Sequence, residues 1–252
     1  MKTHNHPLFI SKILLVLLLS ASLCAAAPTI SYTGKLASDY TGANSTSADG
    51  MITANGGWNN VDHPVTLSWR VSLDSVWHYE YVLTVPDGNL GGGGISHMLL
   101  ETSESFTANN IWNLSWSDTL IGNNYGPGEP GKSNPGIPGD LFGIKFDKVS
   151  EAGEVISFSV DFYSDRNPVW GDFYSKDGVQ NVKGVKTDNT AWNAGFTSPD
   201  TDPSDDPDNG SIGSHLLVPD TQTTRVPAPA ALALGALGVG ITNWLRRKRI
   251  LN

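Results

Sequence analysis

Residues 65–85, VTLSWRVSLDSVWHYEYVLTV, decide the fold class of this chain. In the first half of the stretch, apolar side chains at every second position alternate with Thr, Ser and Arg, which is the period of a β-strand with one buried face. After Asp74 and Ser75 the alternation resumes at Trp77 and ends before the turn sequence PDG at 86–88. Two such runs joined by a short polar turn predict a β-hairpin.

Further alternating runs follow this hairpin, with Gly-containing turn sequences between them. They occupy 96–101, 111–116, 142–146 and 156–162, with weaker runs at 169–174, 179–185 and 216–218. Because no helical period separates them, we expect an all-β fold, with residues 28–220 forming a single antiparallel, jelly-roll-like β-sandwich. The Gly- and Pro-rich segment 122–139 is expected to be a surface loop.

The composition supports this fold and excludes two classes of site. Charged residues make up only 16% of the chain, which disfavours long surface helices. A net charge of -9 offers no basic patch for phosphates, so nucleic acid is not an expected partner. The single cysteine, Cys24, excludes a disulfide framework and a Cys-based zinc site.

The N-terminal residues 1–26 have the pattern of a secretory signal helix. Lys2 and Lys12 precede or flank an apolar run at 13–19, and small residues follow it. We expect cleavage after Ala26, so that Ala27 begins the mature chain and Pro28 does not directly follow the cut bond. The alternative, an uncleaved membrane anchor, would need a longer apolar run than this one. The signal predicts export through the inner membrane.

The C-terminus carries three elements in a fixed order. A linker at 221–229 ends in a Pro motif, an apolar stretch follows at 230–245, and a basic tail occupies 246–252. As a helix, the apolar stretch would be about 24 Å long, which is short for a transmembrane helix but sufficient with local thinning of the bilayer. The basic cluster is expected to stay in the cytoplasm. The residues that define the pattern are Val226, Pro227, Pro229, Arg246, Arg247, Lys248 and Arg249.

This tail resembles the PEP-CTERM sorting signal of Gram-negative bacteria that secrete exopolysaccharide, a signal also named after ice-binding proteins. The resemblance implies recognition by an exosortase, a membrane protease, and delivery to the cell surface or extracellular matrix. Ala228 departs from the family pattern, which has Glu between the prolines. Three patches, 134–139 with 143–147, 168–178 and 191–196, also resemble PEP-CTERM ectodomains of unassigned function, and that likeness implies no catalytic residues.

Motifs for catalysis are missing or weak. The sequence contains no Gly-x-Ser-x-Gly elbow, no His-Glu-x-x-His and no Lys-bearing phosphate loop. His78 with Glu80, and His97 with Glu101, could each place two metal ligands on one strand face, although strand histidines are more often hydrogen-bonded or exposed. Together with Glu104, these glutamates could also supply the carboxylate pair of a glycosidase.

An acidic loop and two tryptophans are the candidate binding residues. Hard oxygen ligands crowd the loop 198–211 and could bind calcium, although Pro203 and Pro207 interrupt the usual spacing of a calcium loop. The ligands would be Asp200, Asp202, Asp205, Asp206 and Asp208. Trp58 and Trp192 lie in Asn- and Gly-rich surroundings and are expected to be exposed, where an indole can stack on a sugar ring. The tryptophans of the alternating runs are expected in the core: Trp69, Trp77, Trp112 and Trp116.

Three functions are compatible with these features. The favoured one is a non-enzymatic surface or matrix protein that contacts exopolysaccharide. The alternatives are a secreted glycan hydrolase or lyase, and a purely structural acidic coat whose charge keeps surfaces apart.

Overall fold

The computed structural model describes residues 30–38, 50–86, 94–127, 134–147, 149, 156–182, 185–198 and 205–219, all of which belong to the unit Ile30–Val226. The predicted signal segment, the linker 221–229, the apolar stretch 230–245 and the basic tail lie outside these residues. No helix within the described ranges has the length and apolar character needed to cross a membrane.

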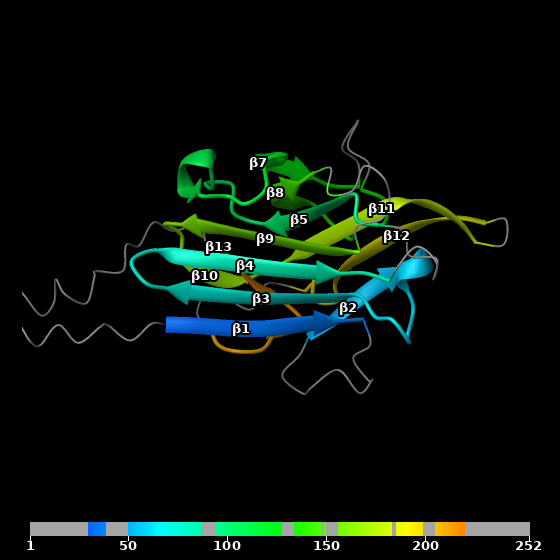
Figure 1. The fold of residues 1–252 in the computed structure, drawn as a ribbon, viewed down its shortest axis with the longest axis horizontal. Helices are drawn as coiled ribbons and strands as arrows, with labels where there is room; N and C mark the ends of the chain where they lie inside the picture. The colour runs from blue at the N-terminus through cyan, green and yellow to red at the C-terminus, as the bar shows by residue number, and fades with distance from the viewer. Residues whose placement is uncertain are drawn as a thin grey trace, which may run out of the picture. The chain divides into compact units, whose positions relative to one another are not determined.

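Strands account for nearly all the regular structure of the described residues, which confirms the predicted all-β class (Figure 1). They are β1 (Ile30–Ala37), β2 (Gly50–Asn55), β3 (Thr66–Leu73), β4 (Trp77–Thr84), β5 (His97–Glu101), β6 (Ile111–Trp112), β7 (Thr119–Tyr125), β8 (Leu141–Phe146), β9 (Ser157–Ser164), β10 (Pro168–Gly171), β11 (Phe173–Val182), β12 (Val185–Asn193) and β13 (Leu216–Pro219). Two short 3₁₀ turns are η1 (Gly56–Trp58) and η3 (Ala108–Asn110).

The predicted hairpin forms the centre of one half of the sheet. Strands β3 and β4 pair antiparallel along their full lengths, from Thr66 opposite Thr84 to Leu73 opposite Trp77. The apolar members of the alternation are buried, as the pattern predicts, except Leu73 at the end of β3, which is half-buried. Strand β1 extends the sheet beside β3, and β9 extends it beside β4.

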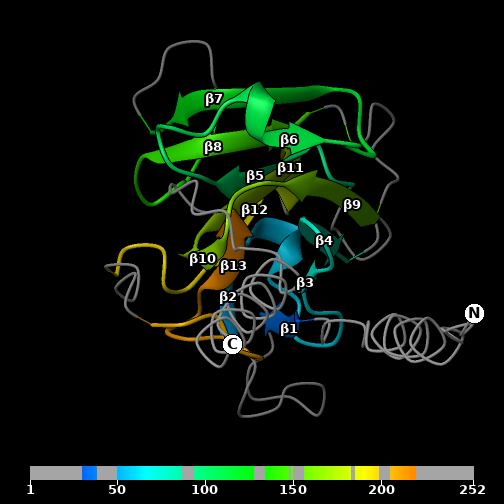
Figure 2. The ribbon, with the colours of Figure 1, turned by 90° about the vertical axis from the view of Figure 1, so that its left-hand side faces the viewer.

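Eleven strands form one continuous sheet in the order β6-β9-β4-β3-β1-β2-β12-β11-β5-β8-β7, and β10 and β13 form a separate pair. The expectation of a wholly antiparallel arrangement is wrong at one junction, because β1 and β2 run parallel. Among the described residues, two pairs make this junction, Leu36 with Gly50 and Ala37 with Met51. It joins two otherwise antiparallel halves, and the ribbon curls over at this point (Figure 2).

The main core lies between the two halves of the curled sheet. Phe158 and Phe162 of β9 meet Phe146 of β8, with ring centroids 6.0 and 6.5 Å apart. The pair β10–β13 contributes Trp170 and Leu217 to the same core. The hydroxyl of Tyr81 on β4 donates to the Leu217 carbonyl oxygen at 2.8 Å, so the small pair is tied to the hairpin. Each half therefore buries its apolar face against the other.

Residues 113–118, which we call the strap, connect the two outer edges of the sheet. The strap leaves β6, which lies beside β9, and enters β7, which lies beside β8. Ser115 is bonded to Asp161 of β9 in both directions, through its backbone N–H and through its hydroxyl as acceptor. The backbone N–H of Asp147, after β8, donates to the carbonyl oxygen of Asp118.

The strap also corrects the prediction for the run 111–116. Only Ile111 and Trp112 are in a strand, because Asn113 adopts a left-handed backbone conformation (φ 52°) that ends the alternation. Trp112 was expected in the core but is 37% exposed. Trp116 packs edge-on against Phe158 from a half-buried position.

Arg166 is the buried cation that fixes the loop between β5 and β6. Its side chain is 5% exposed, and its guanidinium donates to the Ser105 carbonyl oxygen at 2.8 Å and to Asn110 Oδ1 at 3.1 Å. A third bond reaches the Ser105 hydroxyl, and Phe106 lies beneath the guanidinium. These bonds hold the turn η3 against the end of β9.

Replacing Arg166 with Met should lower the free energy of unfolding by roughly 2 kcal/mol or more, because buried acceptors lose their donors. Urea unfolding of the exported chain measures this loss. Arg70→Met is the matched control, since Arg70 is 57% exposed and its 3.7 Å ion pair with Glu80 lies on the surface, where such pairs contribute about 0–1 kcal/mol. Equal losses in the two variants would contradict the assigned role of Arg166.

Candidate functional site

Three ring-bearing side chains lie in register across the outer face of β4, β9 and β6, and we call them the aromatic row. Tyr163 of β9 lies directly opposite His78 of β4 and opposite Trp112 of β6. The rings of His78 and Tyr163 are stacked, with centroids 4.4 Å apart and planes 12° apart. Neighbouring strands are about 4.8 Å apart, so the row covers roughly 10 Å of the sheet surface.

The row faces away from the core because of the strand alternation. Next to His78 on β4, Trp77 and Tyr79 are buried, and next to Tyr163 on β9, Phe162 is buried. Since successive side chains point to opposite faces, His78 and Tyr163 must lie on the solvent side. The two stacked rings come from neighbouring strands, so their planes stand perpendicular to the sheet. The rings therefore present their edges to solvent. Trp112 is the most exposed tryptophan of the described residues.

A second line of side chains, the charged row, runs beside the aromatic row. Arg70 of β3, Glu80 of β4 and Asp161 of β9 occupy successive register positions. Glu80 Oε2 lies 3.7 Å from the Arg70 guanidinium and 3.9 Å from His78 Nδ1. Asp161 Oδ2 lies 3.3 Å from His78 Nε2. The two carboxylates therefore hold the imidazole between them and place hydrogen-bonding groups next to the rings.

The aromatic and charged rows together can contact a ligand that has both C–H faces and hydroxyl groups. Ring edges and the exposed indole offer apolar contact, while the carboxylates and the guanidinium accept and donate hydrogen bonds. The expected metal pair of His78 and Glu80 is used differently, because both side chains belong to this ion-paired arrangement. No group of three His, Cys, Asp or Glu side chains suited to a metal was found among the described residues.

The two tryptophans expected to be exposed are placed differently. Trp58 is completely buried in the main core, so the expectation of an exposed sugar-stacking residue is wrong there. The left-handed Gly56 (φ 64°) and a bond from the Gly57 N–H to Asn189 Oδ1 turn η1 inward. Trp192 is half-buried and packs against a second, smaller core.

This second core lies on the outer face of the other half of the sheet. Its buried members are Leu99, Tyr125, Ile137, Leu141, Tyr174 and Phe196. The segment 134–139, expected to be surface loop, contributes Ile137, which is only 4% exposed. The Tyr174 hydroxyl donates to the Pro135 carbonyl oxygen at 2.8 Å and holds this segment in place. Here the outer sheet face is covered, in contrast to the face that carries the aromatic row.

His97 lies beside the second core and is not a metal ligand in this arrangement. Its Nε2 lies 3.0 Å from Asn134 Oδ1, and its side chain is buried. Burial lowers the pKa of His97 to about 3, and the nearby Lys145 and Lys176 act in the same direction. Its expected partner Glu101 instead accepts a hydrogen bond from the Asp172 N–H at 2.8 Å. The imidazole is therefore neutral and structural.

The acidic loop is only partly described. Asp200 and Asp202 lie outside the described residues, and Asp205, Asp206 and Asp208 are exposed. Asn209 Oδ1 accepts from the Thr33 N–H at 2.9 Å, and the Gly210 N–H donates to the Thr33 carbonyl oxygen, so the end of the loop is attached to β1. Calcium binding at this loop stays a prediction.

A buried polar cluster was missed by the sequence analysis. Asp172 Oδ1 lies 3.0 Å from His215 Nδ1 and accepts from the Asn193 side-chain amide. Asn193 Oδ1 in turn accepts from the Phe173 N–H at 3.0 Å. The patches 168–178 and 191–196 contain two of the three residues, but nothing in their spacing links them to His215. All three side chains are buried, and the cluster joins Asn193 of β12 to the residues that directly precede β11 and β13.

Comparison of the chain with protein-family models, with curated proteins and with solved structures found no match. The function is therefore inferred from the chemistry of the aromatic row and the charged row.

Replacing His97 with Gln should reduce the loss of stability on acidification. The unfolded chain takes up a proton near pH 6.5, whereas the folded chain does so near pH 3. Wild-type stability therefore falls as the pH drops through this window, with a contribution approaching about 1.4 kcal/mol per pH unit. Unfolding in urea at pH 7, 6, 5 and 4 measures the slope. His63→Gln, at an exposed position, is the control, and a His97→Gln slope as steep as that of wild type would refute the assignment.

Proposed function

We propose that this chain is an exported cell-surface or extracellular-matrix protein that contacts exopolysaccharide without acting on it as an enzyme. The observation that carries this proposal is the aromatic row, an in-register set of rings on the solvent face of a sheet, bordered by the charged row. Polysaccharides offer alternating C–H patches and hydroxyls, which match such a surface. The proposal also includes the finer fold assignment, in which the curled sheet is a jelly-roll-like β-sandwich.

The proposed contact residues differ from those expected from the sequence. Trp112 and Tyr163 take the place of Trp58, which is buried, and of Trp192, which is half-buried against the second core. Because the upright rings of His78 and Tyr163 present edges, the indole of Trp112 is the group best placed to stack on a sugar ring. Because the aromatic row extends across β4, β9 and β6, a polysaccharide chain would lie across these strands.

Delivery to the surface is proposed to depend on the C-terminal signal. An exosortase would recognise Val226, Pro227 and Pro229, while the helix 230–245 holds the chain in the inner membrane. The basic residues Arg246, Arg247, Lys248 and Arg249 would keep the C-terminus in the cytoplasm. The signal peptide, with cleavage between Ala26 and Ala27, would start this route.

Replacing Trp112 with Ala should weaken binding to the producer's own exopolysaccharide about five-fold or more, because a stacked aromatic side chain contributes about 1 kcal/mol beyond its buried area. Tyr163→Ala should have a similar effect. Affinity electrophoresis or titration calorimetry of the exported chain measures the change.

Leu120→Ala is the matched control for these variants, since Leu120 is 49% exposed but aliphatic and lies on β7. Binding that is unchanged in both aromatic variants would refute the row as the contact surface. A wild-type protein that binds no polysaccharide would favour the acidic coat, and release of shortened sugars would favour the enzyme.

Replacing Arg246, Arg247, Lys248 and Arg249 with Gln should abolish retention in the membrane, because the positive charges oppose translocation of the tail. Pro227→Ala combined with Pro229→Ala should instead leave the chain inserted but uncut, because the extended backbone that prolines favour is needed to enter a protease. Cell fractionation with measurement of chain size separates the two results. Wild-type amounts of shortened surface protein from both variants would contradict the sorting signal.

A further inference from the structure

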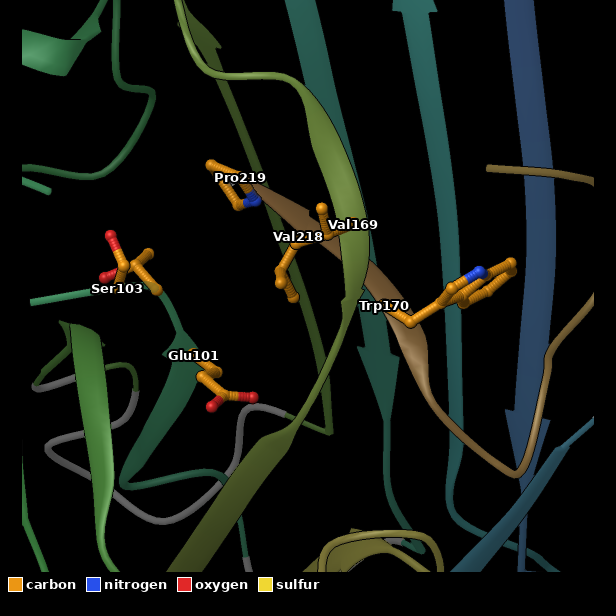
Figure 3. A pocket seen from close by; sticks show the side chains of 7 residues that line it. Glu101, Ser103, Val169, Trp170, Val218 and Pro219 are labelled. Carbon is orange, nitrogen blue, oxygen red and sulfur yellow. The ribbon is translucent and has the colours of Figure 1, made fainter. Parts of the chain in front are cut away.

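A small pocket lies where the end of β5 meets the strand pair β10–β13 (Figure 3). Its volume is about 100 Å³, roughly the space of three water molecules. Glu101 and Ser103 lie on one side of the pocket, and Val169, Val218 and Pro219 lie on the other (Figure 3). The pocket is separate from the aromatic row, and nothing in the proposed function uses it.

The lining carries one carboxylate and, among the described residues, no positively charged side chain. Its polar side chains are the Glu101 carboxylate and the hydroxyls of Thr102 and Ser103. Among the described residues, the lining contains no Lys, Arg, His, Asn or Gln side chain. The remaining N–H-bearing side chain, Trp170, points away from Glu101 (Figure 3). The carboxylate only accepts hydrogen bonds, whereas the two hydroxyls can accept or donate them. The carboxylate therefore favours a ligand group that donates hydrogen bonds and carries positive charge.

The Glu101 carboxylate is fixed in position by the chain behind it. Its Oε2 accepts from the Asp172 N–H at 2.8 Å. Gly171, which precedes Asp172, lets the Glu101 side chain come this close to the backbone. A Cβ at position 171 would lie 3.0 Å from Glu101 Oε2 and closer still to a Val218 methyl group. Asp172 is itself held by His215 and Asn193. The buried polar cluster therefore supports the wall that carries Glu101.

Thr102 gives an independent sign that a hydrogen-bonding group belongs in this pocket. The residue is 4% exposed, and its hydroxyl oxygen has no hydrogen-bond partner within the described part of the chain. A buried hydroxyl without a partner destabilises a protein, whereas a ligand donor would satisfy it.

We propose that this pocket binds the ammonium group of an amino sugar, with Glu101 as the counter-ion, Thr102 and Ser103 as acceptors, and the valines and Pro219 against the adjoining C–H groups. The proposal rests on the proposed contact with exopolysaccharide and specifies its chemistry. The pocket is too small for a whole sugar ring but has room for an amino substituent. The net charge of -9 also favours a partly de-N-acetylated, cationic glycan over an anionic one.

Titration calorimetry with chitosan oligosaccharides and with the fully N-acetylated oligosaccharides of equal length tests the proposal on the exported chain. The wild type should bind the free-amine form at least ten-fold more tightly. Glu101→Gln should abolish that preference and leave the weak binding of the acetylated form unchanged. Glu104→Gln is the matched control, because it removes the same charge at an exposed position three residues away that does not line the pocket. It should change the affinity less than two-fold.

Thr102→Val provides a second variant that is not expected to unfold the protein. It should weaken binding of the free amine while keeping or raising the melting temperature of the unliganded chain, because the unpartnered hydroxyl is removed. A merely structural Thr102 would give a lower melting temperature with unchanged binding.

Three results would overturn the proposal: equal binding of the two oligosaccharides, equal losses in Glu101→Gln and Glu104→Gln, or Glu101-dependent binding of trilysine as tight as that of the amino sugar. The last would assign the pocket to a protein ammonium group. Free-amine binding that depends on Glu101 but survives Trp112→Ala would support the pocket even if the aromatic row failed its own test.

Discussion

The whole structure depends on the burial of one sheet face against itself. Each half of the eleven-stranded sheet has an apolar inner face, and neither half could keep that face in water. The halves meet through Phe146 and Phe162. The sheet can fold over because, in the part of the chain that the structure describes, only two residue pairs join β1 to β2. A long antiparallel pairing at that position would have made the junction stiffer. The sheet therefore bends at the parallel junction between β1 and β2.

The curl leaves two outer sheet faces, and they differ in whether other described residues cover them. One is covered by the segment 134–139 and the second core, which also enclose the neutral His97. The other is left open by the described residues and carries the aromatic and charged rows on β3, β4, β9 and β6. Covering one face with apolar packing removes its side chains from contact with a ligand. The open face is therefore the one on which a ligand can run across several strands.

The sequence predicts the parts of this structure that depend on local periodicity. The alternation at 65–85 is enough to define the hairpin and its buried side. It cannot show that Trp58 is buried, because that depends on the turn at Gly56 and on Asn189, more than a hundred residues away. Trp112 was misplaced because one left-handed residue, Asn113, ends a run that otherwise alternates. The Asp172–His215 contact and the Glu101 pocket arise from the meeting of distant strands, which has no local signature.

The strap has a consequence for the way in which copies of this chain can associate. Exposed strand edges are templates on which identical chains can polymerise into fibrils. Here β6 and Ser115 occupy the end of the β9 edge, and the left-handed Gly122 (φ 72°) interrupts the register of β7 at the opposite edge. Neighbouring molecules thus find no long regular edge at either of these places. Pairing of identical chains edge to edge is therefore disfavoured at these two places.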